Sequence, residues 1–169
     1  MQTIYLITTG GTIEKAYSEQ SGAVLNNTSK IEPYLKRLRL PDCDVRVIPL
    51  MNKDSLEMTH ADRDILVARM NDIIPKGHPI VITHGTDTMV ETGLYLQKAF
   101  PALQIPVVLT GAMTPLGFEG GDGLQNLTES LLAAQLLGPG VFVVMHGQIF
   151  PADRVRKDKA QATFVRTFD

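Results

Sequence analysis

Five short runs of apolar and β-branched residues recur along the chain, and each of the first four is followed by a loop and a helical period. The runs lie at residues 3–9, 45–50, 79–83, 105–109 and 141–145. Continuous apolar runs of this length are typical of strands that are buried on both faces of a parallel sheet. The alternation predicts an α/β fold, with a doubly wound (flavodoxin-like), mostly parallel sheet and helices on both of its faces.

The segments between these runs have helical spacing. Apolar stripes with a period of three to four residues cover 66–74, 89–100 and 124–134. Thr59 precedes the first stripe, as a capping residue does. Ser29 and Glu32 have the spacing of a capping box, which predicts a further helix whose apolar positions extend to Leu38.

Composition excludes several classes of protein. With 169 residues we expect one domain, residues 1–169. A net charge of −2 gives no general attraction to nucleic acid, and the single cysteine, Cys43, excludes an internal disulfide framework. No apolar run approaches the ~20 residues of a membrane span, and the start of the chain is unlike a signal peptide. We therefore expect a cytoplasmic domain without membrane or nucleic-acid partners.

The loops that follow the predicted strands are the expected place for chemistry. Ligands of doubly wound sheets bind outside the carboxyl ends of the strands. The loops at 9–12, 52–55, 84–88 and 111–115 hold a large share of the small hydroxyl and carboxyl residues. We expect the functional site among these loops.

The first loop places Thr12 directly after Gly10 and Gly11. Glycines at a strand end allow unusual backbone angles and close approach of a ligand. The Thr12 hydroxyl could be a nucleophile, a phosphate contact or only a turn hydrogen bond. The loop lacks the third glycine of a dinucleotide fingerprint and the Gly-Lys-Ser/Thr of a P-loop.

The loop at 84–88 is richer in chemical groups. Thr86 is a possible nucleophile and Asp87 a carboxylate beside it, although Asp87 or Thr88 could simply cap the following helix. His84 is a candidate general base, but a lone histidine at a strand end is more often packed and hydrogen-bonded. No G-x-S-x-G elbow occurs, so this is not a serine hydrolase of that kind.

Taken together, the two loops resemble a known family. TTGGTI at 8–13 and THGTDT at 83–88 are similar to the two signature motifs of the bacterial-type L-asparaginase (asparaginase/glutaminase) family. Segments 54–55, 111–115 and 121–127 also match in order, as does 154–157. The chain resembles the short form of the family, which has the catalytic domain and lacks the C-terminal domain of longer members. The resemblance implies an amidohydrolase that converts L-asparagine to L-aspartate and ammonia without a cofactor.

The resemblance also assigns a nucleophile and its activator. Thr12 would attack the side-chain amide carbon and form an acyl-enzyme. Tyr17 would activate it, because family members supply a tyrosine from the segment after the first motif. That segment, 14–27, is rich in Ser, Gly, Asn and Gln and suits a mobile lid.

A second catalytic cluster is implied for Thr86, Asp87 and Lys157. Lys159 is the rival lysine, since both lie in the charged segment 153–159, which would ordinarily be a solvated surface. Which threonine acts in which half-reaction stays open. Backbone amides near Thr12 and Thr86 are the candidates for an oxyanion hole.

Substrate binding would involve residues from three of the loops. Asp87 would pair with the ammonium of asparagine and Ser55 with its carboxylate. The whole implied binding set is Gly11, Asp54, Ser55, Thr86 and Asp87. Leu56 stands where many longer members have a substrate-contacting glutamine.

Other properties follow less directly from the resemblance. A homodimer or a dimer of dimers is expected. Minor glutaminase activity is compatible with the motifs, because one methylene is worth only ~1–3 kcal/mol. An ammonia-supplying amidotransferase component and a non-catalytic asparagine-binding domain are the alternatives. The remaining histidines and Cys43 are interpreted as core or surface residues, and no cluster has metal-ligand spacing.

Overall fold

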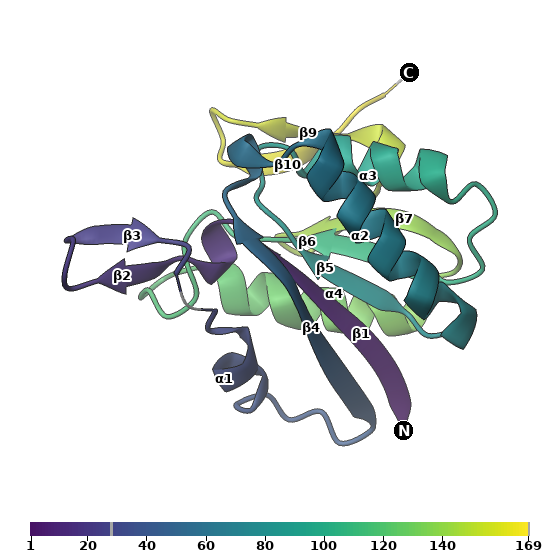
Figure 1. Ribbon diagram of the computed structural model, residues 1–169, viewed down its shortest axis with the longest axis horizontal. Coiled ribbons are helices and arrows are strands. Elements are labelled where there is room, and N and C mark those ends of the chain that lie inside the picture. Colours follow the sequence, from purple (N-terminus) through teal and green to yellow (C-terminus); the bar gives the residue numbers. More distant parts are fainter. Residues whose placement is uncertain (28, 169) are drawn as a thin grey trace.

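The computed structural model describes residues 1–27 and 29–168, and in this part of the chain six strands form one mixed sheet (Figure 1). The strand order is β4-β1-β5-β6-β7-β8. The first five strands in that order are parallel, and β8 is antiparallel to β7. The strands are β1 (Gln2–Gly10), β4 (Cys43–Lys53), β5 (Ile80–Thr83), β6 (Pro106–Thr110), β7 (Gly140–Met145) and β8 (Gln148–Pro151). The parallel part has the 2-1-3-4-5 order of the predicted flavodoxin-like class, so the predicted fold is confirmed.

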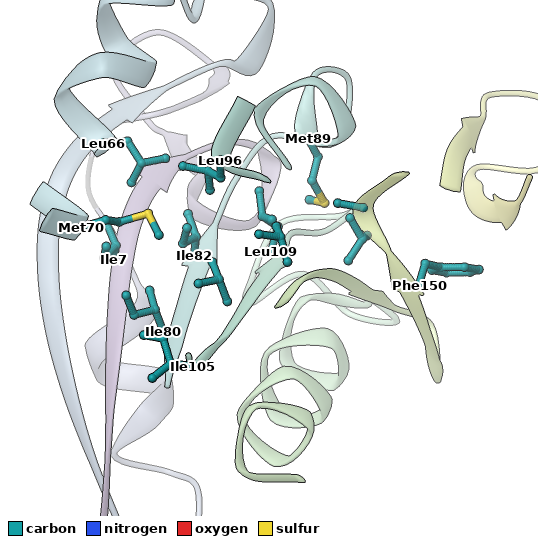
Figure 2. Packing of buried hydrophobic residues seen from close by; sticks show 14 of the residues in the cluster. Ile7, Leu66, Met70, Ile80, Ile82, Met89, Leu96, Ile105, Leu109 and Phe150 are labelled. Carbon is teal, nitrogen blue, oxygen red and sulfur yellow. The ribbon is translucent and has the colours of Figure 1, made fainter. Parts of the chain in front are cut away.

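Helices cover both faces of this sheet, as predicted. They are α1 (Ile31–Leu35), α2 (His60–Ile73), α3 (Met89–Ala99) and α4 (Gly123–Leu136). Side chains of α2 and α3 pack on one face in the cluster of Figure 2, whereas α1 and α4 pack on the other. Successive residues of β1 alternate between the two clusters, since Ile7 joins the first and Leu6 the second. Period-two alternation inside a fully buried strand therefore connects the two layers.

The helix starts show one correct and one wrong prediction. Thr59 caps α2 in a complete capping box, in which Asp62 Oδ2 accepts from Thr59 N at 2.8 Å. The capping box predicted at Ser29 and Glu32 is wrong. Helix α1 begins at Ile31 after Lys30 and ends at Leu35, before Leu38. Ser29 Oγ accepts from Ile31 N at 3.3 Å, in the turn before the helix, and makes no bond to Glu32 N within the described residues.

Two small hairpins and the edge strand β8 were not predicted. One hairpin pairs β2 (Ala16–Ser18) with β3 (Ala23–Leu25) and projects from the body of the molecule (Figure 1). The other pairs β9 (Val155–Asp158) with β10 (Thr163–Arg166). These strands have only three or four residues, too few for a clear alternation of apolar and polar positions. No helix in the described ranges is long and apolar enough to cross a membrane.

Candidate active site

Two glycines bring the first predicted loop against the third. Strands β1 and β5 are neighbours, with Thr8 opposite Thr83. Gly11 has φ +79°, and a Cβ placed on it would lie 2.3 Å from Gly85 N. Any other residue would therefore separate the two backbones. Close backbone packing thus brings together the two loops that carry the TTGGTI and THGTDT motifs.

A buried carboxylate holds together the ends of the two strands that lead into the Gly11 and Gly85 loops. Thr12 begins a 3₁₀ turn, Thr12–Glu14, and the Glu14 side chain turns back into the protein. Its Oε2 accepts hydrogen bonds from Gly10 N at 2.7 Å and Thr83 Oγ1 at 3.0 Å. Burial raises the pKa of Glu14 above its ordinary value. The sequence analysis did not identify Glu14. The only hint in the sequence was a charged residue next to Ile13.

Lysine and hydroxyl groups meet at the second motif. Lys157 lies on β9, and its Nζ donates to Thr86 Oγ1 at 2.7 Å and Asp87 Oδ1 at 2.9 Å. The rival Lys159 is exposed beyond the end of that strand. The charged segment 153–159, which would ordinarily be a solvated surface, therefore contributes an ammonium group that points into the protein. Such a group can stabilise a developing alkoxide or exchange a proton with it.

The loop after β4 contributes a buried hydroxyl. Ser55 is buried, and its Oγ has no hydrogen-bond partner among residues 1–27 and 29–168. A Cβ on Gly85 would lie 2.5 Å from this oxygen, so the hydroxyl borders the second motif. Thr88 makes no side-chain cap on α3 and instead donates to Ser55 O at 2.9 Å. This loop is thus tied to the second motif by the residue that could have been a helix cap.

Asp54 is engaged within the protein. Its Oδ2 pairs with Lys15 Nζ at 2.8 Å, and its Oδ1 accepts from Leu56 N at 3.1 Å. These contacts, that of Lys15 first, hold the pKa of Asp54 below its ordinary value. Asp54 therefore organises the turn that carries Ser55.

Tyr17 lies apart from these contacts. It occupies the projecting β2–β3 hairpin with 58% of its surface exposed. The base of the hairpin is tied down by Asn26, whose Nδ2 donates to Gly11 O at 2.8 Å and Asn52 Oδ1 at 2.9 Å. A cleft of about 390 Å³ beside the hairpin is lined by residues that include Lys15, Asn26, Asn52 and Asp54.

His84 is packed in the interior, which was the second of the two interpretations drawn from sequence. Its side chain is fully buried, and burial lowers its pKa to about 4, so the ring is neutral near pH 7. His146 joins two elements, because Nε2 lies 2.6 Å from Asp122 Oδ2 and Nδ1 2.9 Å from Thr163 Oγ1. In the described part of the chain, no three His, Cys, Asp or Glu side chains are grouped to hold a metal ion.

Comparison with known proteins places this geometry in context. The family model described as "Asparaginase, N-terminal" matches residues 3–169. A probable L-asparaginase of Deinococcus radiodurans is 33% identical over 156 residues, which cover 90% of this chain and 46% of that protein. One subunit of the glutamyl-tRNA(Gln) amidotransferase of Aeropyrum pernix is 32% identical over 158 residues, 87% of this chain and 35% of its own length.

A solved structure agrees with these sequence matches. The thermostable L-asparaginase from Thermococcus kodakarensis superposes with a TM-score of 0.86 at 27% identity. The superposition covers 98% of this chain and 51% of that one. The chain therefore spans about half the length, or less, of the relatives that it matches.

Proposed function

The chain belongs to the asparaginase family, and from this premise we propose that it hydrolyses the side-chain amide of L-asparagine to L-aspartate and ammonia. One observation carries the proposal. The loops of Thr12 and Thr86 meet at Gly11 and Gly85, and Lys157 Nζ donates to Thr86 Oγ1 at 2.7 Å. Two hydroxyls and an ammonium at the carboxyl edge of a doubly wound sheet suit acyl transfer.

The reaction proceeds in two displacements. Thr12 Oγ1 attacks the amide carbon and loses its proton, and backbone amides at the two loops stabilise the oxyanion. The C–N bond then breaks, ammonia leaves with that proton, and an ester to Thr12 remains. Water hydrolyses the ester and regenerates the hydroxyl. Tyr17 reaches Thr12 when the β2–β3 hairpin closes, and its hydroxyl relays the proton from Thr12 to the departing ammonia.

The second cluster supports proton movement, and the site binds both charged ends of the substrate. The Lys157 ammonium lowers the energy of negative charge on Thr86, which makes that hydroxyl a proton carrier. Asp87 pairs with the substrate ammonium, and the unpartnered Ser55 hydroxyl donates to its carboxylate. Gly11 provides backbone contact, and Asp54 contributes by shaping the Ser55 turn.

Ammonia release by the purified protein tests this proposal. We expect hydrolysis of L-asparagine, a loss of at least about 10³-fold in kcat for Thr12→Ala and for Thr86→Ala, and partial activity for Thr12→Ser. Unfolding curves of each variant verify that it is folded. Undiminished kcat in both alanine variants would refute the proposal. Parallel kinetics with L-glutamine measure any minor glutaminase activity.

A second candidate function is favoured by one comparison. The Aeropyrum pernix relative is named as part of an amidotransferase, so this chain could supply ammonia to a partner. Amide hydrolysis that depends on a co-purifying protein or tRNA would favour that candidate. Asparagine binding by calorimetry without ammonia release would instead indicate a binding domain. As part of the leading proposal, residues 1–169 act as a single catalytic domain. We also propose that the protein is cytoplasmic and forms a homodimer.

A further inference from the structure

A buried row of side chains leads from helix α2 to the second motif. Arg63, on α2, is only 2% exposed, and Thr92 and His84 are fully buried. Arg63 Nε donates to Thr92 Oγ1 at 3.0 Å, and Thr92 Oγ1 lies 2.8 Å from His84 Nε2. His84 Nδ1 lies 2.7 Å from Gly85 O. A guanidinium in the interior is costly, and only one further partner, Glu91 at 3.2 Å, balances its charge among the described residues.

The hydrogen bonds of this row can run in only one donor-to-acceptor direction, because some of its groups can only donate and others can only accept. A guanidinium can only donate, so the Thr92 oxygen accepts from Arg63. The Thr92 proton then goes to His84 Nε2 at 2.8 Å, a closer and stronger acceptor than Met58 Sδ at 3.8 Å. Gly85 O can only accept, so His84 Nδ1 must carry the proton. The opposite tautomer would place a nitrogen lone pair 2.7 Å from a carbonyl oxygen. Met58 Sδ, 3.1 Å from Nε2, is only a weak acceptor and does not reverse this order.

The last hydrogen bond sets the orientation of one peptide group. The peptide between Gly85 and Thr86 is planar and trans, so its C=O and N–H point in opposite directions. With Gly85 O held inward by His84, the Thr86 N–H must face outward. No acceptor for this N–H occurs among residues 1–27 and 29–168.

We propose that the Arg63–Thr92–His84 row is a positioning device, which aims the Thr86 N–H at the oxyanion of the reaction. This inference rests on the proposed amide hydrolysis and adds to it. None of the three side chains touches the substrate, and each acts through the next. The function of His84 is thus to hold a peptide as a neutral ring of fixed tautomer.

Thr92→Val tests the device, because it removes the hydroxyl with little change in shape. We expect kcat for asparagine to fall roughly 10–100-fold while KM changes less than about twofold, since oxyanion contacts form in the transition state. Thr92→Ser, which restores the hydroxyl, should recover most of kcat. The control is Thr128→Val on α4, whose hydroxyl bonds only to Leu124 O among the described residues.

Nitrogen-15 NMR of the His84 ring provides a second measurement that a purely structural role would not change. We expect a proton on Nδ1 alone in the wild type, and a mixture of tautomers in Thr92→Val. A wild-type ring protonated on Nε2 would overturn the inference. So would an active enzyme in which Thr92→Val shifts the tautomer and leaves kcat unchanged. A wild type that releases no ammonia would show instead that the proposed function fails, and the oxyanion role with it.

Discussion

Single residues in this protein gain their roles from neighbours that are distant in the sequence. Lys157 and Thr86 are 71 positions apart, yet their side chains are hydrogen-bonded. The register of the β9–β10 hairpin places Lys157 opposite Phe164, which is buried in the same hydrophobic cluster as residues of α2 and α3. Burial of Phe164 therefore anchors the strand from which the ammonium extends.

Replacing each of the two lysines separately tests this assignment. We expect Lys157→Met to lower kcat by roughly 10²–10⁴-fold, the usual contribution of a positioned proton-transfer group. Lys159→Met is the matched control, because Lys159 is exposed, and its kcat should stay within about twofold. Steady-state ammonia assays compare the two. Equal losses, or a larger loss for Lys159→Met, would contradict the role given to Lys157.

Among the secondary-structure elements, helix α2 links the fold to the site. Asp62, the third residue of this helix and the partner of Thr59 in its capping box, also accepts from Lys53 Nζ at 2.7 Å, at the end of β4. The loop that carries Ser55 begins just after Lys53. The same helix supplies Arg63 to the row behind the second motif. The start of α2 therefore supports two features of the candidate site: the loop that carries Ser55 and the row that begins at Arg63.

Acid unfolding measures this contribution. The hydrogen bond from Lys53, followed by that from Thr59 N, lowers the pKa of Asp62 to about 2. Because the folded-state value lies below the unfolded value of about 3.9, Asp62 stabilises the fold above pH ~4, and this stabilisation is lost as the pH falls toward 2.

We expect Asp62→Asn to have a lower free energy of unfolding than the wild type at pH 5–7. The gap should narrow as the pH approaches 2, as followed by urea unfolding. Asp72→Asn, at the exposed end of the same helix, should show only a small gap throughout. A gap for Asp62→Asn that stays constant with pH would contradict the ionic role.

For the whole molecule, the β8 edge of the sheet favours association. Strand β8 lies at one end of the sheet and carries Ile149, which is 41% exposed. Leu132 and Leu136 of α4 expose 57% and 76% of their surfaces. These apolar side chains surround a shallow groove of about 220 Å³. Exposed apolar groups at an open sheet edge are typical of contact surfaces between protein chains.

We expect the purified chain to have twice the monomer mass of 18.5 kDa in sedimentation or light scattering, as a homodimer does. Leu136→Lys should shift the equilibrium toward the monomer by placing a charge in the contact. Ile65→Lys, an equally simple change at an exposed position on α2, should leave the mass unchanged. A monomer at all concentrations would refute this expectation.

Local patterns along the chain were enough to predict the layers of this protein and to mark two loops of its candidate site. Periodicity records which side of an element is buried, so strands such as 79–83 and helices such as α2 could be predicted. Glycines and threonines after β1 and β5 marked the two loops, because backbone needs are local. Short polar strands such as β9 left no periodic signal and were missed.

Which side chains meet, in contrast, depended on the packing of the whole chain. The fold selected Lys157 over Lys159, buried Glu14 beneath the first loop, placed Tyr17 on a projecting hairpin and made His84 a neutral link between Thr92 and Gly85. The Lys157–Thr86 and Glu14–Thr83 contacts join residues that are 71 and 69 positions apart in the sequence. They depend on strand order and register, which arise when all the elements pack together and not from the pattern of any one segment.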